Sequence, residues 1–126
     1  MAGLFEVANK LVVLAAGRSL EWTNRTAIAV QDADPAAVND GVALLTSPTV
    51  LFRVQPSSGA TASVRVWAYS EAAGGWSVVN GGAFDTVADV GLYERINVGG
   101  LDRLFIQVTA ITGGTVDISI GKAIVE

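Results

Sequence analysis

The chain has 126 residues, 51% of them hydrophobic and only 16% charged, with a formal net charge of −4 at pH 7 and neither cysteine nor histidine. This length suits one domain with its own core, and the missing Cys and His exclude thiol nucleophiles, Cys/His zinc sites and Ser-His-Asp triads. Because an average soluble domain is about 25% charged, the low charge needs an explanation.

A membrane segment does not explain the low charge. The longest uninterrupted apolar run is Leu11–Ala16, six residues, whereas a spanning helix needs about 20. Glu6 also stands where a secretory signal would be basic. The negative net charge disfavours nucleic acid and anionic lipid as partners. We therefore expect the apolar residues to lie in a core or against other protein.

The first 48 residues contain three candidate strands, which are Leu4–Val7, Leu11–Ala15 and Thr26–Val30. Residues 32–39 (DADPAAVN) contain two Asp, one Asn and a proline, which predicts a loop with one helical turn after Pro35. Segment 1–16 is apolar and has only two charged residues. It is either a first strand or an N-terminal arm that reaches a partner. As an arm, it would make interface contacts through Leu4, Phe5, Leu11 and Val12.

From residue 49 onward the sequence is a series of strand-like runs, at Val50–Val54, Ser63–Tyr69, Trp76–Val79, Leu92–Val98, Arg103–Ile111 and Val116–Ile120. Alternation with a period of two and many β-branched residues indicates half-buried strands. Gly-Gly pairs separate the runs at residues 74–75, 81–82, 99–100 and 113–114, and glycine accepts the positive φ of tight turns. The segment Ile111–Val116 (ITGGTV) is the strongest hairpin prediction.

This spacing of strands and turns predicts an all-β fold. No linker divides the chain, so we expect residues 1–126 to form a single antiparallel β-sandwich of eight or nine strands, with a jelly-roll topology. Four apolar residues alternate with positions already assigned inward, namely Leu51, Trp67, Phe105 and Ile111. Apolar side chains on an outer face imply burial against a further sheet or a neighbouring subunit.

No catalytic constellation is recognisable, and we expect no enzyme activity, no cofactor and no metal. The acidic loop around Asp32, Asp34 and Asp40 offers oxygen ligands, but it lacks the spacing and the final Glu of an EF-hand. An alternative binding function rests on Trp67, Tyr69 and Trp76, which would form an aromatic platform for a carbohydrate. The competing interpretation is that these rings fill the core or an interface.

Two segments resemble small bacteriophage virion structural proteins. They are SVRVWAYS at residues 63–70, followed by GWSVV at 75–79, and DRLFIQVTAITG at 102–113. The resemblance spans roughly Thr49 to Lys122, while the first 48 residues show none. It implies a capsid decoration or cement protein with a β-sandwich or barrel fold, and it carries over no catalytic residue.

The resemblance also implies partners and a location. The major capsid protein would be the partner, and the chain would form a homo-oligomer, with a trimer favoured over a dimer. It would be made in the bacterial cytoplasm and placed on the capsid surface of the virion. The alternative is a carbohydrate-binding or receptor-binding module of a fibre or tail, acting through the three aromatic residues.

Overall fold

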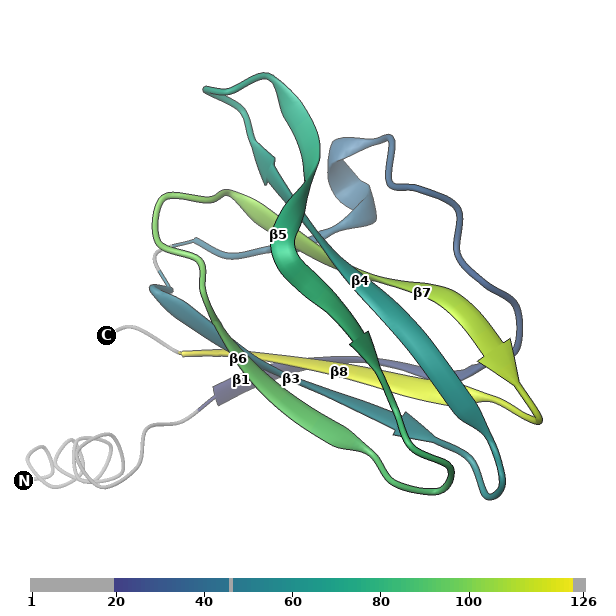
Figure 1. Cartoon of the computed structure of the whole chain (residues 1–126). Helices are drawn as coiled ribbons and strands as arrows, with labels where there is room; N and C mark the ends of the chain where they lie inside the picture. The colour runs from purple at the N-terminus through teal and green to yellow at the C-terminus, as the bar shows by residue number, and fades with distance from the viewer. Residues whose placement is uncertain (1–19, 46, 124–126) are drawn as a thin grey trace, which may run out of the picture.

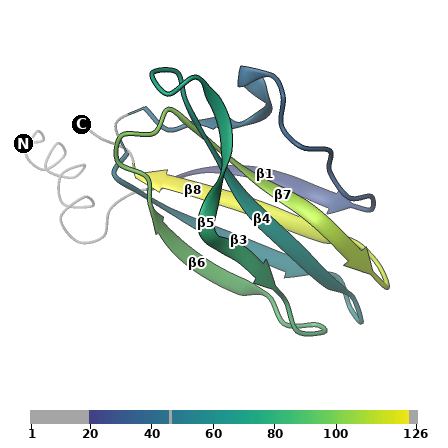
Figure 2. The ribbon, with the colours of Figure 1, turned by 45° about the horizontal axis from the view of Figure 1, so that its top comes forward.

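The computed structural model describes residues 20–45 and 47–123, which form two four-stranded antiparallel sheets packed face to face (Figures 1 and 2). The strands are β1 (Leu20–Ile28), β2 (Val42–Ala43), β3 (Thr49–Pro56), β4 (Thr61–Ser70), β5 (Gly75–Asp85), β6 (Leu92–Asn97), β7 (Arg103–Thr112) and β8 (Val116–Ala123). A single 3-10 turn, η1 (Val38–Asp40), precedes β2. The expected all-β sandwich is confirmed, as is the helical turn after Pro35.

The strand order is that of a jelly roll. One sheet, here called the β1 sheet, has the order β1-β8-β3-β6, and the other, the β2 sheet, has the order β2-β7-β4-β5. The chain crosses from one sheet to the other at every connection except β4–β5. This arrangement of two interleaved four-stranded sheets confirms the predicted topology.

The hairpin prediction for Ile111–Val116 is wrong, although the turn is present. β7 ends at Thr112 and β8 begins at Val116, but the two strands belong to opposite sheets. The turn is tied instead to the β3–β4 turn, where Ser57 N–H donates to Thr115 O at 2.8 Å. A Gly-Gly turn can lead to a strand that pairs with the preceding strand or to a strand in the opposite sheet. The local sequence is the same in both cases, so it does not distinguish them.

The Gly-Gly pair at 81–82 is also not a turn. Both glycines lie inside β5, in a bulge opposite Val66. Gly81 has φ +78°, and a Cβ on Gly82 would lie 3.0 Å from the Val66 Cβ. Glycine is therefore needed here for a bulge and a close approach between strands.

The core lies between the sheets and consists of the inward residues of the alternating runs. It includes Leu44, Val50, Phe52, Val54, Ala62, Val64, Val66, Val98, Leu104, Ile106, Val108, Val116, Ile118 and Ile120. Ile111 packs against this core as well, contrary to its expected outward position. The reason is a second bulge: Val108 pairs with Val64 and Ala110 with Ser63, so Thr109 is an extra residue that reverses the alternation.

The predicted strand Thr26–Val30 is shifted from the observed β1, Leu20–Ile28. β1 is an edge strand with mostly exposed side chains, so its sequence lacks strong apolar alternation. The other two N-terminal runs and the expected contacts Leu4, Phe5, Leu11 and Val12 lie outside the described residues. Among residues 20–45 and 47–123, no helix has the length and apolar character needed to cross a bilayer.

Candidate functional site

The outer face of the β2 sheet carries the predicted aromatic residues. The strand register places Trp67 between Val78 on β5 and Phe105 on β7. Tyr69 lies in the next row, beside Trp76. The three predicted aromatics are therefore brought to one face, while their use in ligand binding stays a prediction.

Two of these rings support the loop between β1 and β2. The Trp76 indole N–H donates to Ala37 O at 3.1 Å, and its ring centre lies 5.4 Å from that of Tyr69. Gly41 packs so closely on the Trp76 ring that a Cβ would overlap it and would lie 2.9 Å from Leu104 O. Trp76 thus holds part of the loop against the sheet, and Tyr69 supports the loop through its contact with the Trp76 ring.

An ion pair closes the edge of the β2 sheet where the short β2 leaves β7 uncovered. The Arg25 guanidinium donates to both Asp32 carboxylate oxygens, at 3.0 and 2.8 Å, and to Ile106 O at 3.0 Å. Asp32 also exchanges bonds with Val108, accepting from its N–H at 2.9 Å and donating to its carbonyl at 2.8 Å. The guanidinium lies 5.2 Å from the centre of the Phe105 ring. These groups satisfy backbone positions that a neighbouring strand would otherwise pair.

A buried amide links the aromatic row to the same loop. Gln107 is 5% exposed and accepts a hydrogen bond from the Trp67 indole N–H at 2.7 Å. Its NH₂ group donates to the Asp34 carboxylate at 2.8 Å and to Asp32 O at 3.2 Å. Because both ends of the amide are satisfied, its burial is tolerated. The network fixes the positions of Trp67 and Asp34.

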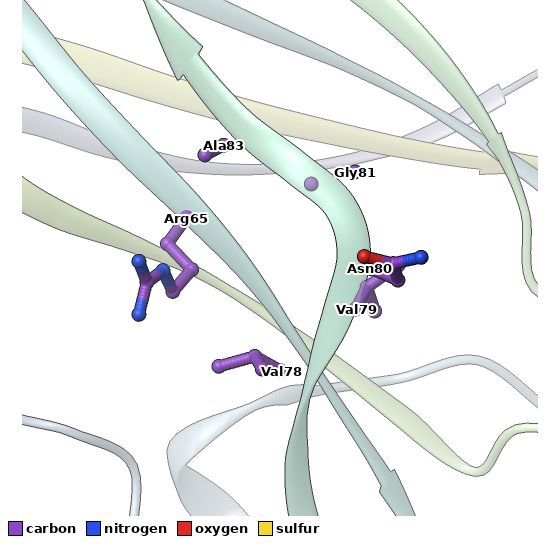
Figure 3. Close-up of a pocket in the computed structure, with 7 residues that line it drawn as sticks. Arg65, Val78, Val79, Asn80, Gly81 and Ala83 are labelled. Carbon is purple, nitrogen blue, oxygen red and sulfur yellow. The ribbon is translucent and has the colours of Figure 1, made fainter.

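Arg65 is an exposed cation on this face, beside Gln107 on β7 and Ala83 on β5. In the part of the chain that the structure describes, its side chain has no hydrogen bond or ion pair. A hollow of about 290 Å³ borders it on the β5 side, where Figure 3 shows Arg65 and Val78 extending the same way from their strands. A second hollow, of about 480 Å³, lies between Arg65, β7 and loop residues 31–34.

A smaller hollow, of about 220 Å³, opens at the seam between the two sheets. The core side chains of Ile106, Ile118 and Ile120 line its inner part. Polar side chains of β1 and the η1 region line its opening, namely Thr23, Arg25, Asn39 and Asp40. An apolar floor with a polar rim is suited to an apolar group that carries one polar end.

The acidic residues of the β1–β2 loop are engaged separately. Asp32 and Asp34 make the bonds described above, and Asp40 accepts from the backbone N–H groups of Ala36 and Ala37, at 2.8 Å each. These two bonds favour the charged carboxylate and hold the pKa of Asp40 below its ordinary value of 3.8. Among the described residues, no group of three or more Asp, Glu, His or Cys side chains is placed to hold a metal ion.

Large hydrophobic side chains are exposed at both ends of the sandwich and on both edge strands of the β1 sheet. At one end, Val87 and Val90 form the β5–β6 turn and are 70% and 56% exposed. At the opposite end, Leu45 in the β2–β3 connection is 77% exposed (Figure 1). On the edges, Trp22 of β1 and Tyr93 of β6 are 42% and 61% exposed. Turns normally carry polar residues or glycine, so the paired valines are unusual.

The connection between the aromatic face and the β1–β2 loop is not predictable from the sequence. Alternation placed Arg65 and Trp67 on one face, which the register confirms. The bonds from Gln107 to Asp34 and to Asp32 join residues more than 70 positions apart. No local pattern signals such a contact, since it depends on how the loop crosses the sheet.

Comparison with known proteins shows similarity in fold. No protein-family model and no curated protein sequence matches the chain. The SPBc2 prophage-derived protein YomS matches with a TM-score of 0.50 and 13% identity, over 83% of this chain and 96% of YomS. PirA matches with a TM-score of 0.41 and 10% identity, over 84% of this chain and 82% of PirA. A protein from Bacillus endospore appendages, described as a novel family of disulfide-linked pili, has a TM-score of 0.38 and 12% identity, over 86% and 88% of the two chains.

Proposed function

We propose that the chain is a non-enzymatic structural protein of a bacteriophage particle, specifically a capsid cement or decoration protein. In this role it binds across neighbouring major capsid protein subunits at the virion surface and stabilises the head. Support comes from the fold shared with a prophage-derived protein and from the resemblance of residues 63–79 and 102–113 to small virion proteins. Jelly rolls are also common among viral capsid domains.

The observation that carries the proposal is the distribution of exposed hydrophobic residues. Val87, Val90 and Leu45 lie at the two ends of the sandwich, and Trp22 and Tyr93 lie on opposite edge strands of the β1 sheet. The others are Val30 and Val38 in the β1–β2 connection and Val78 on β5. Exposed apolar residues that group together mark contacts with other protein, and Val87 and Val90 form such a group on one turn. Small patches on several sides suit a protein that touches several neighbours at once.

The proposed mechanism is additive binding. Each copy favours the assembled head over its separated or expanded states, because its contacts exist only when neighbouring subunits hold the right spacing. Several weak contacts on one rigid sandwich act together, since the first fixes the position of the others. Rupture of the head must then break these contacts as well as those between coat subunits.

The proposal includes a homo-oligomer, with a trimer favoured over a dimer, and interface contacts from Leu4, Phe5, Leu11 and Val12. Light scattering of the purified chain measures its mass in solution. We expect the trimer mass for the unmodified chain and a smaller species for Phe5→Asp and Leu11→Asp. A monomeric unmodified chain would show that this part of the proposal is wrong.

The capsid assignment is tested with particles of the phage that, under this proposal, encodes the chain. We expect the chain to copurify with DNA-filled heads, in a fixed ratio to the major capsid protein. Heads lacking it should rupture at a lower temperature than complete heads. Adding the purified chain back to these heads should restore the original rupture temperature.

The contribution of Val87 and Val90, in the β5–β6 turn, is tested by adding variants of the purified chain to the deficient heads. Val87→Asp or Val90→Asp should weaken binding to the deficient heads, while Asn80→Asp adds the same charge at another exposed position and should bind normally. Recovery of the chain only in tail fractions, or unchanged rupture of deficient heads, would rule out a cement role.

A further inference from the structure

Arg65 lies between two irregularities of the β2 sheet. On β5, residues 79–82 oppose the single residue Val66, because Arg65 pairs with Ala83 and Trp67 with Val78. On β7, Thr109 is the extra residue of the second bulge. Bulges are frequent next to functional sites, where they redirect side chains and open the ladder.

Each bulge borders one of the two hollows that Arg65 lines. The β5 bulge forms the wall of the 290 Å³ hollow, from Val78 to Ala83 (Figure 3). Thr109 lines the 480 Å³ hollow, which has the size of an ordinary small-ligand pocket. The two bulges therefore create space on both sides of one exposed guanidinium that has no partner among the described residues.

The wall that faces Arg65 across the larger hollow is polar and preorganised. It consists of Gln31, Asp32, Asp34, Gln107 and Thr109, with Ala33 between the two acids. Asp32 is occupied by Arg25, whereas Asp34 receives a single bond, from the amide of Gln107. Asp34 thus keeps lone pairs for a ligand hydroxyl, and Thr109 adds a hydroxyl that both donates and accepts.

These groups define the chemistry of a ligand. An arginine fork binds a carboxylate or a phosphate through two parallel hydrogen bonds. A carboxylate such as Asp34 accepts hydrogen bonds from hydroxyl groups and repels additional negative charge. A polyanion is therefore disfavoured, consistent with the net charge of −4. A ligand with one carboxylate and several hydroxyls satisfies both walls.

We propose that the cleft around Arg65 binds a carboxylate-bearing sugar, such as the uronate or sialate unit of a polysaccharide. Arg65 holds the sugar carboxylate, while Asp34 and Thr109 bond to ring hydroxyls. Trp67 is the next residue on the same face of β4, and its indole N–H is held by Gln107, which lines the cleft. This site is independent of the capsid contacts and adds a ligand-binding function to the chain.

The test uses the full chain and two defined probes that each carry one carboxylate, glucuronate and 3′-sialyllactose. Each probe is compared with its carboxyl-reduced counterpart, which keeps the hydroxyls and removes the charge. Binding is measured by titration calorimetry and by the change in tryptophan fluorescence. We expect saturable binding of at least one acidic probe, and binding at least about tenfold weaker for its reduced form, because a charge-assisted pair is lost.

Variants locate the site. Arg65→Ala should weaken binding of the acidic probe at least about tenfold, and Arg65→Lys should have an intermediate effect because it keeps the charge without the fork. Arg95→Ala removes an exposed arginine from the outer face of the opposite sheet and should leave binding unchanged. Thermal unfolding of each variant confirms that it is folded.

Three results would overturn the proposal. The first is absence of binding of both acidic probes at about 1 mM. The second is equal binding of an acidic probe and its reduced form, which would leave no role for the carboxylate. The third is an equal loss in Arg65→Ala and Arg95→Ala, which would indicate non-specific charge attraction.

Discussion

The two arginines next to the β2 sheet differ in their contacts. Arg25 lies at the β7 edge of the sheet, and Arg65 lies on the outer face of β4. Beside β7, Arg25 bonds to Asp32 and to a backbone carbonyl and lies against an aromatic ring. On β4, one strand further in, Arg65 is exposed and has no such partner in the described ranges. The first arginine replaces a missing strand, and the second is left available for a ligand. The difference follows from the β1–β2 loop, whose residues Asp32 and Asp34 bond to β7 and make no bond to Arg65.

The largest expected effect is on the free energy of unfolding, which should depend on Arg25 and hardly on Arg65. Arg25→Ala or Asp32→Ala should lower the free energy of unfolding by about 2–3 kcal/mol, because each leaves a charged partner and β7 backbone groups without their hydrogen bonds. Arg65→Ala should change it by less than about 0.5 kcal/mol, as at an ordinary exposed position. Urea denaturation measures both. Equal losses for Arg25→Ala and Arg65→Ala would show that the contacts of Arg25 do not stabilise the fold more than the exposed Arg65 does.

A smaller effect is expected where the loop rests on the sheet. Gly41→Ala places a Cβ against the Trp76 ring and Leu104 O, so the loop must move outward. We expect a loss of about 1–2 kcal/mol from overpacking, together with a shift of tryptophan emission. Gly99→Ala is the matched control, since its Cβ would make an ordinary contact, 3.6 Å from Asn97 Oδ1.

The smallest effect concerns pH at the η1 turn. The pKa of Asp40 is lowered in the folded chain by the two backbone N–H bonds, so the group stabilises the fold above its unfolded pKa. This contribution should disappear as the pH falls from about 4 through the lower folded value. Thermal unfolding of the unmodified chain and Asp40→Asn should therefore differ slightly at pH 6 and converge near pH 2. A difference that persists in acid would mean that the charge is not its source.

Much of the fold was predictable because it depends on local patterns. Alternation at Val50, Phe52 and Val54 identifies an inward face without any knowledge of the partner strand, and burial confirms it. The N-terminal strand was less predictable, because an exposed edge such as β1 needs little apolar periodicity. Bulges reverse the pattern without a sequence signal of their own, as the inward position of Ile111 shows.

The candidate site was predictable only in part. The face shared by Arg65, Trp67 and Tyr69 follows from their spacing of two along one strand. The opposite wall of the cleft comes from a loop and from another strand, and the hydrogen bond between Gln107 and Asp34 joins residues 73 positions apart. Periodicity describes one strand at a time, so it contains no information on which loop crosses which face.

The apolar residues that accompany the low charge are placed partly by the sequence pattern and partly by tertiary packing. An all-β sandwich follows from local patterns, since alternation and glycine turns depend on neighbouring residues. The same alternation indicates that some apolar residues face outward. Three features arise only when the chain is packed: which turns cross between sheets, which outward rings support the β1–β2 loop, and which arginine stays free. These outcomes depend on contacts between distant segments, and such contacts form only when the two sheets and the loop are packed together.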